Sequence, residues 1–196
     1  MSYSIKAIAD DCYEGTSCLV NKFNIQDEEQ LLKIEAGITL AKMAELERTP
    51  IGNTFDFDHY KQIHKYLFED LYDWAGKTRT VDISKKGTQF TSADKIDTVA
   101  EACFDRLKSL DYFKNLDFDD FVDNIVDLYC STNMIHPFRE GNGRTQRVFI
   151  SQLIRFCGYD INFSDIDTDE LMIATIHAAN GITDYLKEIF CNYINK

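Results

Sequence analysis

The chain has 196 residues, of which 44% are hydrophobic and 28% are charged, a composition typical of one soluble globular domain. Asp and Glu outnumber Lys and Arg by 33 to 21, so the formal net charge is −12 at pH 7. This acidity argues against nucleic acid or an anionic membrane surface as the main partner, because both repel negative charge. The sequence contains neither a secretory leader pattern nor an apolar run long enough to span a bilayer, so we expect a cytoplasmic protein.

The N-terminal part of the chain predicts two helices after an irregular start. The first 25 residues are mixed in character, and we expect them to be irregular or partly extended. Apolar residues at helical spacing predict helices over residues 27–47 and 57–73. Pro50 and Gly52 separate these two helices, because both residues interrupt helical geometry.

A short β-hairpin and five further helices are expected in the rest of the chain. Apolar and polar residues alternate over residues 79–90, with a plausible turn at Lys86 and Gly87. The periodicity then predicts helices over residues 94–110, from 117 to 135 or 136, from 143 or 144 to 156, over 169–179 and over 182–193. Six or seven helices with one hairpin make a mainly α protein.

One stretch, residues 136–147 with the sequence HPFREGNGRTQR, has the composition of neither a core nor a solvated surface. Its Gly141-Asn142-Gly143 segment runs into a helix, so unpaired backbone N–H groups and the positive helix end would face an anion. Arg144 and Arg147 share one face of the first helical turn, where cations are unfavourable unless a polyanion is bound. The segment therefore predicts a site for nucleotide phosphates.

Two further residues of this stretch suggest chemistry. Glu140 would repel phosphate unless a cation stood between them, which suggests Mg²⁺ held by this carboxylate and by phosphate oxygens. His136 would then be placed to take a proton from an incoming hydroxyl group. Each feature alone has an ordinary structural explanation, but their combination within twelve residues favours a catalytic site.

The motif resembles the signature of Fic-domain proteins, HPFx[DE]GNGRxxR, at every defining position. Residues 55–90 are similar to the segment that precedes this signature, in which a helix leads to a Trp-Ala-Gly turn and a hairpin called the flap. The resemblance covers residues 55–190 and implies an all-α Fic fold of six to eight helices, with the flap over the active site. Residues 1–54 would be an N-terminal extension and first helix packed on the core, and residues 55–196 the Fic domain.

The resemblance implies Mg²⁺-dependent transfer of AMP from ATP to a Ser, Thr or Tyr hydroxyl group of a target protein. By position in the motif, His136 is the general base and Glu140 holds the Mg²⁺. The remaining motif residues bind the triphosphate: Gly141, Asn142 and Gly143 at the α-phosphate, Arg144 at the β-phosphate and Arg147 at the γ-phosphate. The flap residues expected to hold the target by main-chain pairing are Ile83, Ser84, Lys85, Lys86 and Gly87.

Two departures from related patterns bear on the reaction and its control. Doc relatives, which transfer phosphate, carry lysine where this chain has Gly143, so the resemblance favours AMP transfer. Many Fic proteins carry an inhibitory motif, [ST]xxxE[GN], but no Ser or Thr in this sequence is followed by Glu at the fourth position. The chain thus resembles the toxin class that is silenced by a separate small antitoxin with that motif, and whose relatives modify topoisomerase subunits.

Two other functions stay open at this point. The chain could be a nucleotide-binding interaction module without transferase activity, although His136 speaks against it because a binder does not require a base. The same site could also transfer phosphate or another nucleotide-linked group. The target, its modified residue, the oligomeric state, the adenine-pocket residues and the function of residues 1–50 are not determined by the sequence. Arg79 is either structural or part of the active-site rim.

Overall fold

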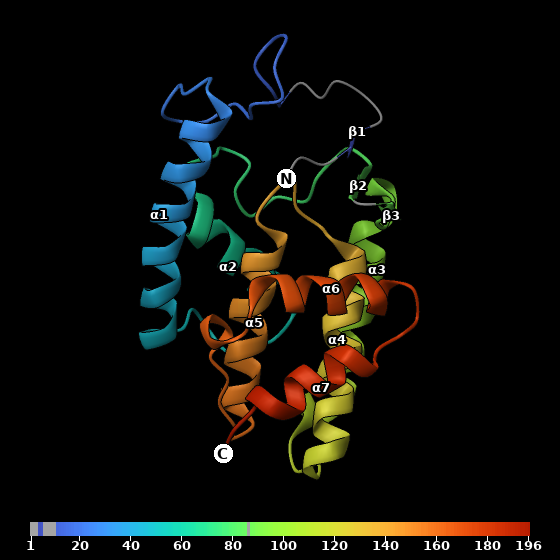
Figure 1. The fold of residues 1–196 in the computed structure, drawn as a ribbon. Helices are drawn as coiled ribbons and strands as arrows, with labels where there is room; N and C mark the ends of the chain where they lie inside the picture. The colour runs from blue at the N-terminus through green and yellow to red at the C-terminus, as the bar shows by residue number, and fades with distance from the viewer. Residues whose placement is uncertain (1–3, 6–10, 86) are drawn as a thin grey trace.

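The computed structural model describes residues 4–5, 11–85 and 87–196. In these residues it contains seven α-helices and three short strands (Figure 1). The helices are α1 (Glu28–Arg48), α2 (Phe57–Phe68), α3 (Ile96–Ser109), α4 (Phe118–Ile135), α5 (Asn142–Phe156), α6 (Thr168–Ala179) and α7 (Asp184–Tyr193). The strands are β1 (Ser4–Ile5), β2 (Ile83–Lys85) and β3 (Thr88–Gln89). The predicted all-α fold with a small hairpin is confirmed.

The helices pack as a bundle around α5. Helix α5 contacts α2, α4 and α1, and α3 lies against α4 on the far side of the bundle (Figure 1). Helices α6 and α7 pack on each other and cross the bundle beside α4. Aromatic rings fill the space between α2 and the motif, with Tyr60 stacked on Phe138 at 5.7 Å and meeting Phe149 edge-on at 5.3 Å. Phe138 is fully buried in this aromatic cluster.

Aspartates define where four of the helices begin. The side chains of Asp27, Asp56, Asp117 and Asp167 each accept a hydrogen bond from a backbone N–H in the first helical turn. Each such cap stabilises its helix by about 1 kcal/mol, because it pairs a donor that the helix itself leaves unpaired. The positions of these four aspartates are therefore explained by the helix starts.

Helix α2 is shorter than its sequence pattern indicates. The apolar spacing predicts a helix to residue 73, but α2 ends at Phe68 and the chain continues in turns. The carbonyl oxygen of Phe68 accepts hydrogen bonds from both Leu71 and Tyr72, which closes the turn. Leu71 and Tyr72 are still buried, so the apolar pattern continues although the helix does not.

The sheet has one more strand than expected. Strands β2 and β3 form the predicted hairpin, with Gly87 at φ 84°, whereas Lys86 lies outside the described residues. Strand β1 pairs antiparallel with the other edge of β2, with Ser4 opposite Ser84 and Ile5 opposite Ile83. The sheet order is β1-β2-β3, so β2 is hydrogen-bonded on both sides.

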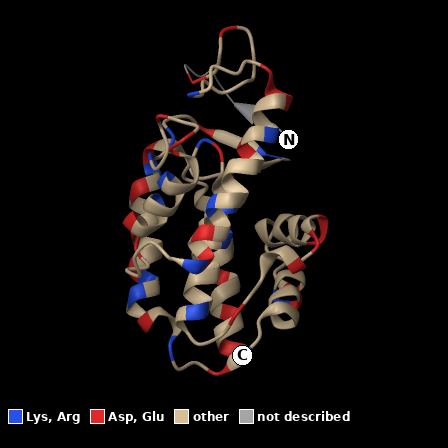
Figure 2. Ribbon diagram, turned by 90° about the vertical axis from the view of Figure 1, so that its left-hand side faces the viewer, with Lys and Arg blue, Asp and Glu red and all other residues tan. Residues whose placement is uncertain are grey.

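Basic and acidic residues are interspersed over the helices. Figure 2 shows Lys and Arg scattered among Asp and Glu rather than gathered on one face. None of the helices in the described part of the chain combines the length and apolar character that crossing a membrane requires.

Candidate active site

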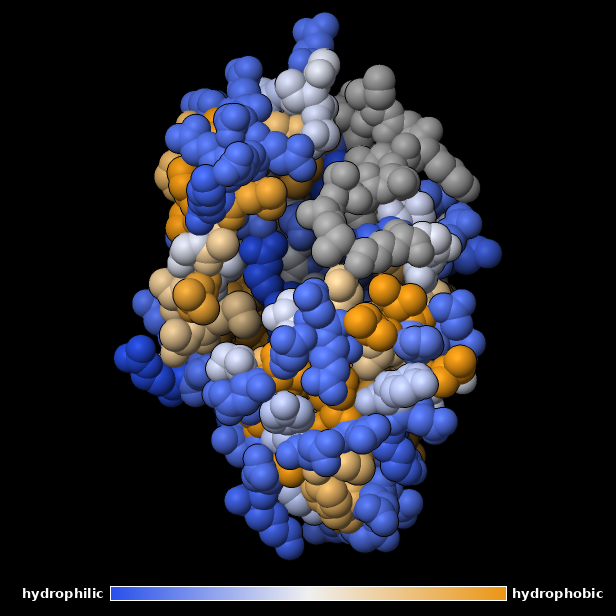
Figure 3. Space-filling model, viewed as in Figure 1, coloured by the Kyte–Doolittle hydropathy of each residue, from blue (hydrophilic) through white to orange (hydrophobic). Residues whose placement is uncertain are grey.

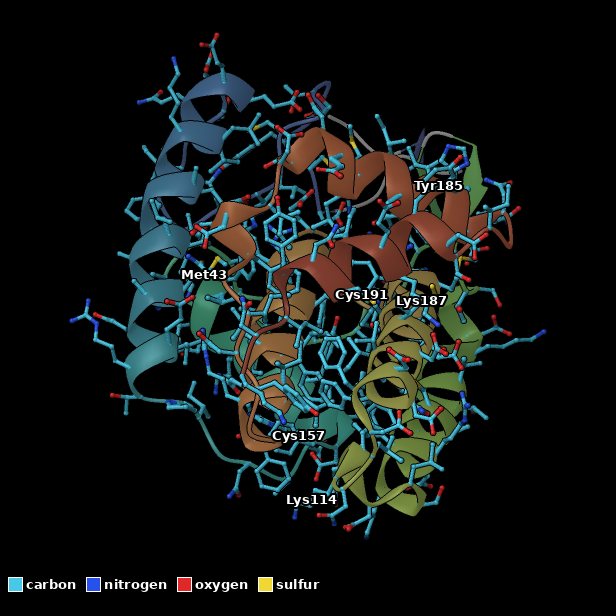
Figure 4. The ribbon with its side chains drawn as sticks, turned by 60° about the horizontal axis from the view of Figure 1, so that its bottom comes forward. Met43, Lys114, Cys157, Tyr185, Lys187 and Cys191 are labelled. Atoms are coloured by element: carbon cyan, nitrogen blue, oxygen red, sulfur yellow. The ribbon has the colours of Figure 1, made fainter. Side chains whose placement is uncertain are left out.

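A cavity of about 670 Å³ opens between α1, the hairpin and α6. Its polar wall is made by the end of α4 and the start of α5, and its apolar wall by one face of α1 and by α6. Figure 3 shows apolar atoms over α6 on this side of the molecule. Figure 4 shows Met43 on the side of α1 that faces α5 and α6, whereas Lys114 and Cys157 lie at the other end of the bundle. The cavity brings together His136, Gly143, Arg144, Arg147 and Lys85.

The loop between α4 and α5 begins and ends on left-handed residues. His136 ends α4 with φ 45°, and Pro137 follows it. Gly141 precedes α5 with φ 81°, and a Cβ atom there would lie 2.2 Å from Cζ of the Phe68 ring. Only glycine satisfies both the backbone angle and this close approach. Gly141 therefore sets the direction of the chain where α5 begins.

Arg79 ties the hairpin to the end of α4. Its side chain is 5% exposed, and its Nε donates to the carbonyl oxygen of His136 at 2.9 Å. Its Nη atoms donate to the carbonyl oxygens of Val81 and Thr91, which flank the hairpin. The guanidinium thus pairs with carbonyl groups at the end of α4 and on both sides of the hairpin, which the helix and the strands leave without a donor. Of the two interpretations left open by the sequence, the structural one is confirmed.

His136 has a defined neutral form. Its ring stacks on that of Phe90, the residue after β3, with 3.7 Å between the ring centroids. Its Nδ1 lies 3.0 Å from the carbonyl oxygen of Asn133. A carbonyl oxygen only accepts, so Nδ1 carries the proton and the lone pair of the neutral ring is on Nε2. Burial, followed by the positive charges of Lys85 and Arg79, lowers the pKa of His136 to about 3. The imidazole is therefore neutral near pH 7, with its lone pair on Nε2.

His64 of α2 contacts the loop of the motif through a hydrogen bond and a ring stack. Gly76 N–H donates to its Nδ1 at 2.8 Å, so Nε2 carries the proton and donates to the carbonyl oxygen of Glu140 at 3.0 Å. The ring stacks on Phe138 at 3.8 Å, and burial lowers its pKa to about 3. One buried histidine thus joins the Trp-Ala-Gly turn to the motif loop.

The start of α5 presents backbone donors without a side-chain cap. Gly141 is the N-cap residue, and no side chain pairs with the first N–H groups of the helix. The Asn142 side chain is occupied elsewhere, because it donates to the carbonyl oxygen of Phe138 at 2.7 Å and accepts from the Phe138 N–H at 2.8 Å. An anion at this helix end would therefore meet backbone N–H groups and not the Asn142 amide.

The two arginines of the motif differ in their partners. Arg144 forms ion pairs with Glu35 at 2.5 Å and with Glu140 at 3.4 Å. Arg147 lines the cavity, and no acidic side chain of the described residues pairs with it. Burial lowers the pKa of the Arg147 guanidinium, which remains charged near pH 7 because its ordinary value is 12.5. A polyanion entering the cavity would therefore meet one guanidinium without a partner.

Glu140 is the single motif residue whose chemistry suits a divalent cation. Its Oε1 accepts from the Gly141 N–H at 2.8 Å and contacts Arg144, while the side chain stays 27% exposed. In the described part of the chain, no cluster of three His, Cys, Asp or Glu residues could hold a metal ion without help. One carboxylate plus substrate phosphates and water is a set that Mg²⁺ commonly takes, so the residues present fit this ion.

Three contacts of the motif were not predicted from the sequence. Glu35 and Thr39 of α1 hold Arg144, and Asp11 pairs with Arg139 at 2.6 Å. In each pair the partner lies more than a hundred positions away, so no local spacing could have revealed it. Residues outside the expected Fic domain therefore contribute directly to the motif's geometry.

The sequence is similar to those of known proteins. A model of the Fic/DOC family matches residues 54–154. The chain is 37% identical over 174 residues to protein adenylyltransferase VbhT of Bartonella schoenbuchensis, covering 89% of this chain and 36% of that protein. It is 34% identical over 171 residues to the probable protein adenylyltransferase y4lH of Sinorhizobium fredii, covering 87% and 88%. The probable protein adenylyltransferase Fic of Escherichia coli is 30% identical over 184 residues, covering 94% and 91%.

Solved structures show the same fold. The BepC protein of Bartonella tribocorum with bound AMPPNP matches with a TM-score of 0.87 at 26% identity, over 94% of this chain and 96% of that one. The N-terminal Fic domain of a putative cell filamentation protein from Bartonella quintana, with bound ADP, matches with a TM-score of 0.89 at 26% identity, over 94% of each chain. The chain belongs to the Fic/DOC family, which confirms the family predicted from residues 136–147.

Proposed function

We propose that this protein transfers AMP from ATP to a hydroxyl side chain of a target protein. The observation that carries this proposal is the cavity in which a neutral imidazole, an unpaired guanidinium and an uncapped helix N-terminus meet. Its volume of about 670 Å³ suits a nucleotide, and its apolar wall suits a base. The names of the relatives as protein adenylyltransferases, and the ADP and AMPPNP held by two structural neighbours, support the same reaction.

The proposed step is an in-line displacement at the α-phosphorus of ATP. The target oxygen forms a bond to this phosphorus, and its proton passes to Nε2 of His136. The bond between the α-phosphorus and the bridging oxygen breaks, and pyrophosphate leaves with the electron pair. Arg144 and Arg147 hold the charge of the leaving group, and the backbone N–H groups of Asn142 and Gly143 face the α-phosphate. Positioning and charge neutralisation of this kind supply most of the catalysis in phosphoryl-type transfer.

Glu140 is the residue that would hold Mg²⁺. When bound there with the phosphates, the ion would neutralise part of their charge. The protein's own contribution is to keep the Glu140 carboxylate close to the helix start, through the hydrogen bond from the Gly141 N–H at 2.8 Å.

The hairpin is the proposed docking edge for the target. Lys85 of β2 and Thr88 of β3 line the cavity, which supports docking of the target on this hairpin. The pairing of β1 with β2 supports this proposal, because it shows that the outer edge of β2 accepts a partner strand. A target segment would take the place of Ser4 and Ile5 at Ile83 and Ser84.

We also propose that a separate small antitoxin controls the enzyme in the cytoplasm. The sequence contains no [ST]xxxE[GN] motif, and no carboxylate of the described residues occupies Arg147. The glutamate of an inhibitory helix would supply that carboxylate and exclude the γ-phosphate. Leu40, which is 69% exposed at the cavity wall, offers such a helix an apolar contact. Co-expression with a small protein carrying the motif should abolish protein labelling, whereas labelling by a stable complex of the two would refute this control.

The transfer reaction is tested by labelling. The purified protein is incubated with Mg²⁺, a cell lysate or topoisomerase subunits, and ATP labelled at either the α- or the γ-phosphate. We expect protein-bound label from the α-position only, and its loss in the His136→Ala variant. His177→Ala is the matched control, because His177 lies on α6 and does not line the cavity. Mass spectrometry should find an added AMP on Ser, Thr or Tyr.

The other outcomes identify the alternatives. Label from the γ-phosphate would indicate phosphate transfer. Binding of ATP without any labelling would indicate a nucleotide-binding interaction module. Labelling that persists in His136→Ala would refute the proposed base.

A further inference from the structure

Helix α1 places a buried carboxylate against the motif, although it lies outside the residues that the family model matches. Glu35 is only 2% exposed, and its Oε1 is 2.5 Å from Nη2 of Arg144. The hydroxyl group of Tyr72 donates to the other carboxylate oxygen. Both oxygens of Glu35 are therefore paired, one with a fixed neutral donor and one with the motif arginine.

Arg144 is fixed by more than this one contact. Its Nη1 donates to Thr39 Oγ1 at 3.1 Å, and Thr39 itself donates to the backbone carbonyl of Glu35 at 2.8 Å. The guanidinium carbon lies 4.8 Å from the centre of the Phe68 ring. A guanidinium has five N–H donors in one plane, so contacts on two of its nitrogens and one of its faces define its orientation. Its remaining donors keep one direction relative to the cavity.

The position of Glu35 also affects the ion pair between Arg144 and Glu140. Arg144 lies 2.5 Å from Glu35 but 3.4 Å from Glu140, so the buried carboxylate is its closer partner. Without Glu35, the positive charge of Arg144 would be compensated by Glu140 alone. The α1 carboxylate therefore leaves Glu140 available for other contacts.

A purely structural explanation does not account well for this pair. A buried ion pair contributes little net stability, because the desolvation of both charges offsets their attraction. An apolar pair would join α1 to the bundle equally well. Here the charged pair lies where α1 lines the cavity, through Ala36, Thr39 and Leu40 on the same helix face.

We propose that Glu35 is a positioning residue that, with Tyr72 and Thr39, presents Arg144 to the β-phosphate of ATP. This inference rests on the proposed function, in which Arg144 binds that phosphate. Glu35 acts through Arg144 and does not touch the nucleotide. The substrate feature that it serves is the second phosphate, so AMP should be insensitive to it.

The test compares the affinities of ADP and AMP by calorimetric titration of the full chain. Glu35→Gln keeps the shape of the side chain but removes its charge. We expect ADP affinity to fall about tenfold, the usual size of effect when a charge-assisted hydrogen bond is disturbed, with AMP affinity unchanged. Glu45→Gln is the matched control, because Glu45 of α1 also pairs with a tyrosine of α2, Tyr66, but lies away from the motif. This control should bind both nucleotides as the unchanged protein does.

A double-mutant cycle with Arg144→Ala separates the two levels of the inference. If Arg144→Ala weakens ADP relative to AMP, and Glu35→Gln adds nothing in that background, the positioning function is confirmed. If Arg144→Ala weakens ADP but Glu35→Gln does not, the inference about Glu35 is wrong and the proposed function stands. If Arg144→Ala affects ADP and AMP alike, the assignment of Arg144 to the β-phosphate is itself wrong.

Folding is controlled with a milder variant. Tyr72→Phe removes the second hydrogen bond of Glu35 but keeps the aromatic ring, which stacks on Trp74 at 4.4 Å. It should weaken ADP binding severalfold and leave AMP binding unchanged. A loss of AMP and ADP affinity together, in parallel with a lower Tm for both Glu35→Gln and Tyr72→Phe, would show a structural role only and overturn the proposal.

Discussion

Acid should destabilise this protein through two buried histidines. His64 and His136 both have pKa values lowered by burial from the ordinary 6.5 to about 3. Burial keeps each ring neutral, and a hydrogen bond to a backbone carbonyl selects its tautomer: that of Glu140 for His64 and that of Asn133 for His136. Protonation of either ring would place a positive charge in an apolar stack, on Phe138 in one case and on Phe90 in the other.

The direction of the effect follows from proton binding. Between about pH 3 and pH 6.5 the unfolded chain binds more protons than the native protein, so the free energy of unfolding falls as the pH falls. At about 1.4 kcal/mol per pKa unit, each histidine removes about 2 kcal/mol between pH 7 and pH 5. His59, whose pKa is also lowered by burial, adds to the loss in the same direction. Against a typical total of about 5–15 kcal/mol, this loss is large enough to measure.

The assay is urea denaturation at several pH values between 7 and 5. His136→Ala should lose about 2 kcal/mol less than the unchanged protein over this range, because the contribution of His136 is gone while those of His64 and His59 remain. Leu46→Ala is the control: it empties part of the core and should lower the free energy of unfolding equally at every pH. If His136→Ala keeps the full acid dependence, then His136 is not buried in its neutral form, and the reasoning about its lone pair fails.

Three substitutions test the framework of the site. Gly141→Ala should cost about 3 kcal/mol in urea denaturation, since its Cβ would lie 2.2 Å from Cζ of Phe68 at a φ of 81°; an unchanged midpoint would mean that the ring moves aside freely. Arg79→Met should cost about 3 kcal/mol or more, because buried carbonyl oxygens lose their donors; a cost under about 1 kcal/mol would contradict the clamp. Arg147→Ala should leave the Tm unchanged or raise it, because a partly buried charge without an acidic partner is removed, while ATP affinity falls; a lower Tm would reveal a structural role.

Local signals in the sequence placed most of the fold. Aspartates at helix starts, Pro137 after α4 and Gly141 before α5 are each sufficient to locate an element end, because capping and backbone angles act over a few residues. The hairpin followed from alternation and the glycine at its turn. The signal that predicts a phosphate site at residues 136–147 is likewise local, since the charges and glycines of this motif adjoin in sequence.

Contacts between distant segments were not predictable in this way. Helical spacing indicated that α1 exists, but α1 carries several glutamates, and nothing local shows that Glu35 turns inward to Arg144. The function of Arg79 depends on the carbonyl group of His136, which lies at the end of α4, 57 positions further along the sequence. The early end of α2 was missed because Leu71 and Tyr72 stay buried in turns, and an apolar pattern does not distinguish a turn from a helix.

The third strand has a consequence for how target affinities would be measured. Because β2 carries β1 on one side and β3 on the other, its backbone has no vacant edge. A target can pair with Ile83 and Ser84 only in molecules in which Ser4 and Ile5 have detached from β2. Its apparent Kd is therefore the intrinsic Kd divided by the fraction of molecules in that detached state. Two proteins with identical catalytic residues would then differ in target affinity if the pairing of β1 with β2 were more stable in one of them than in the other.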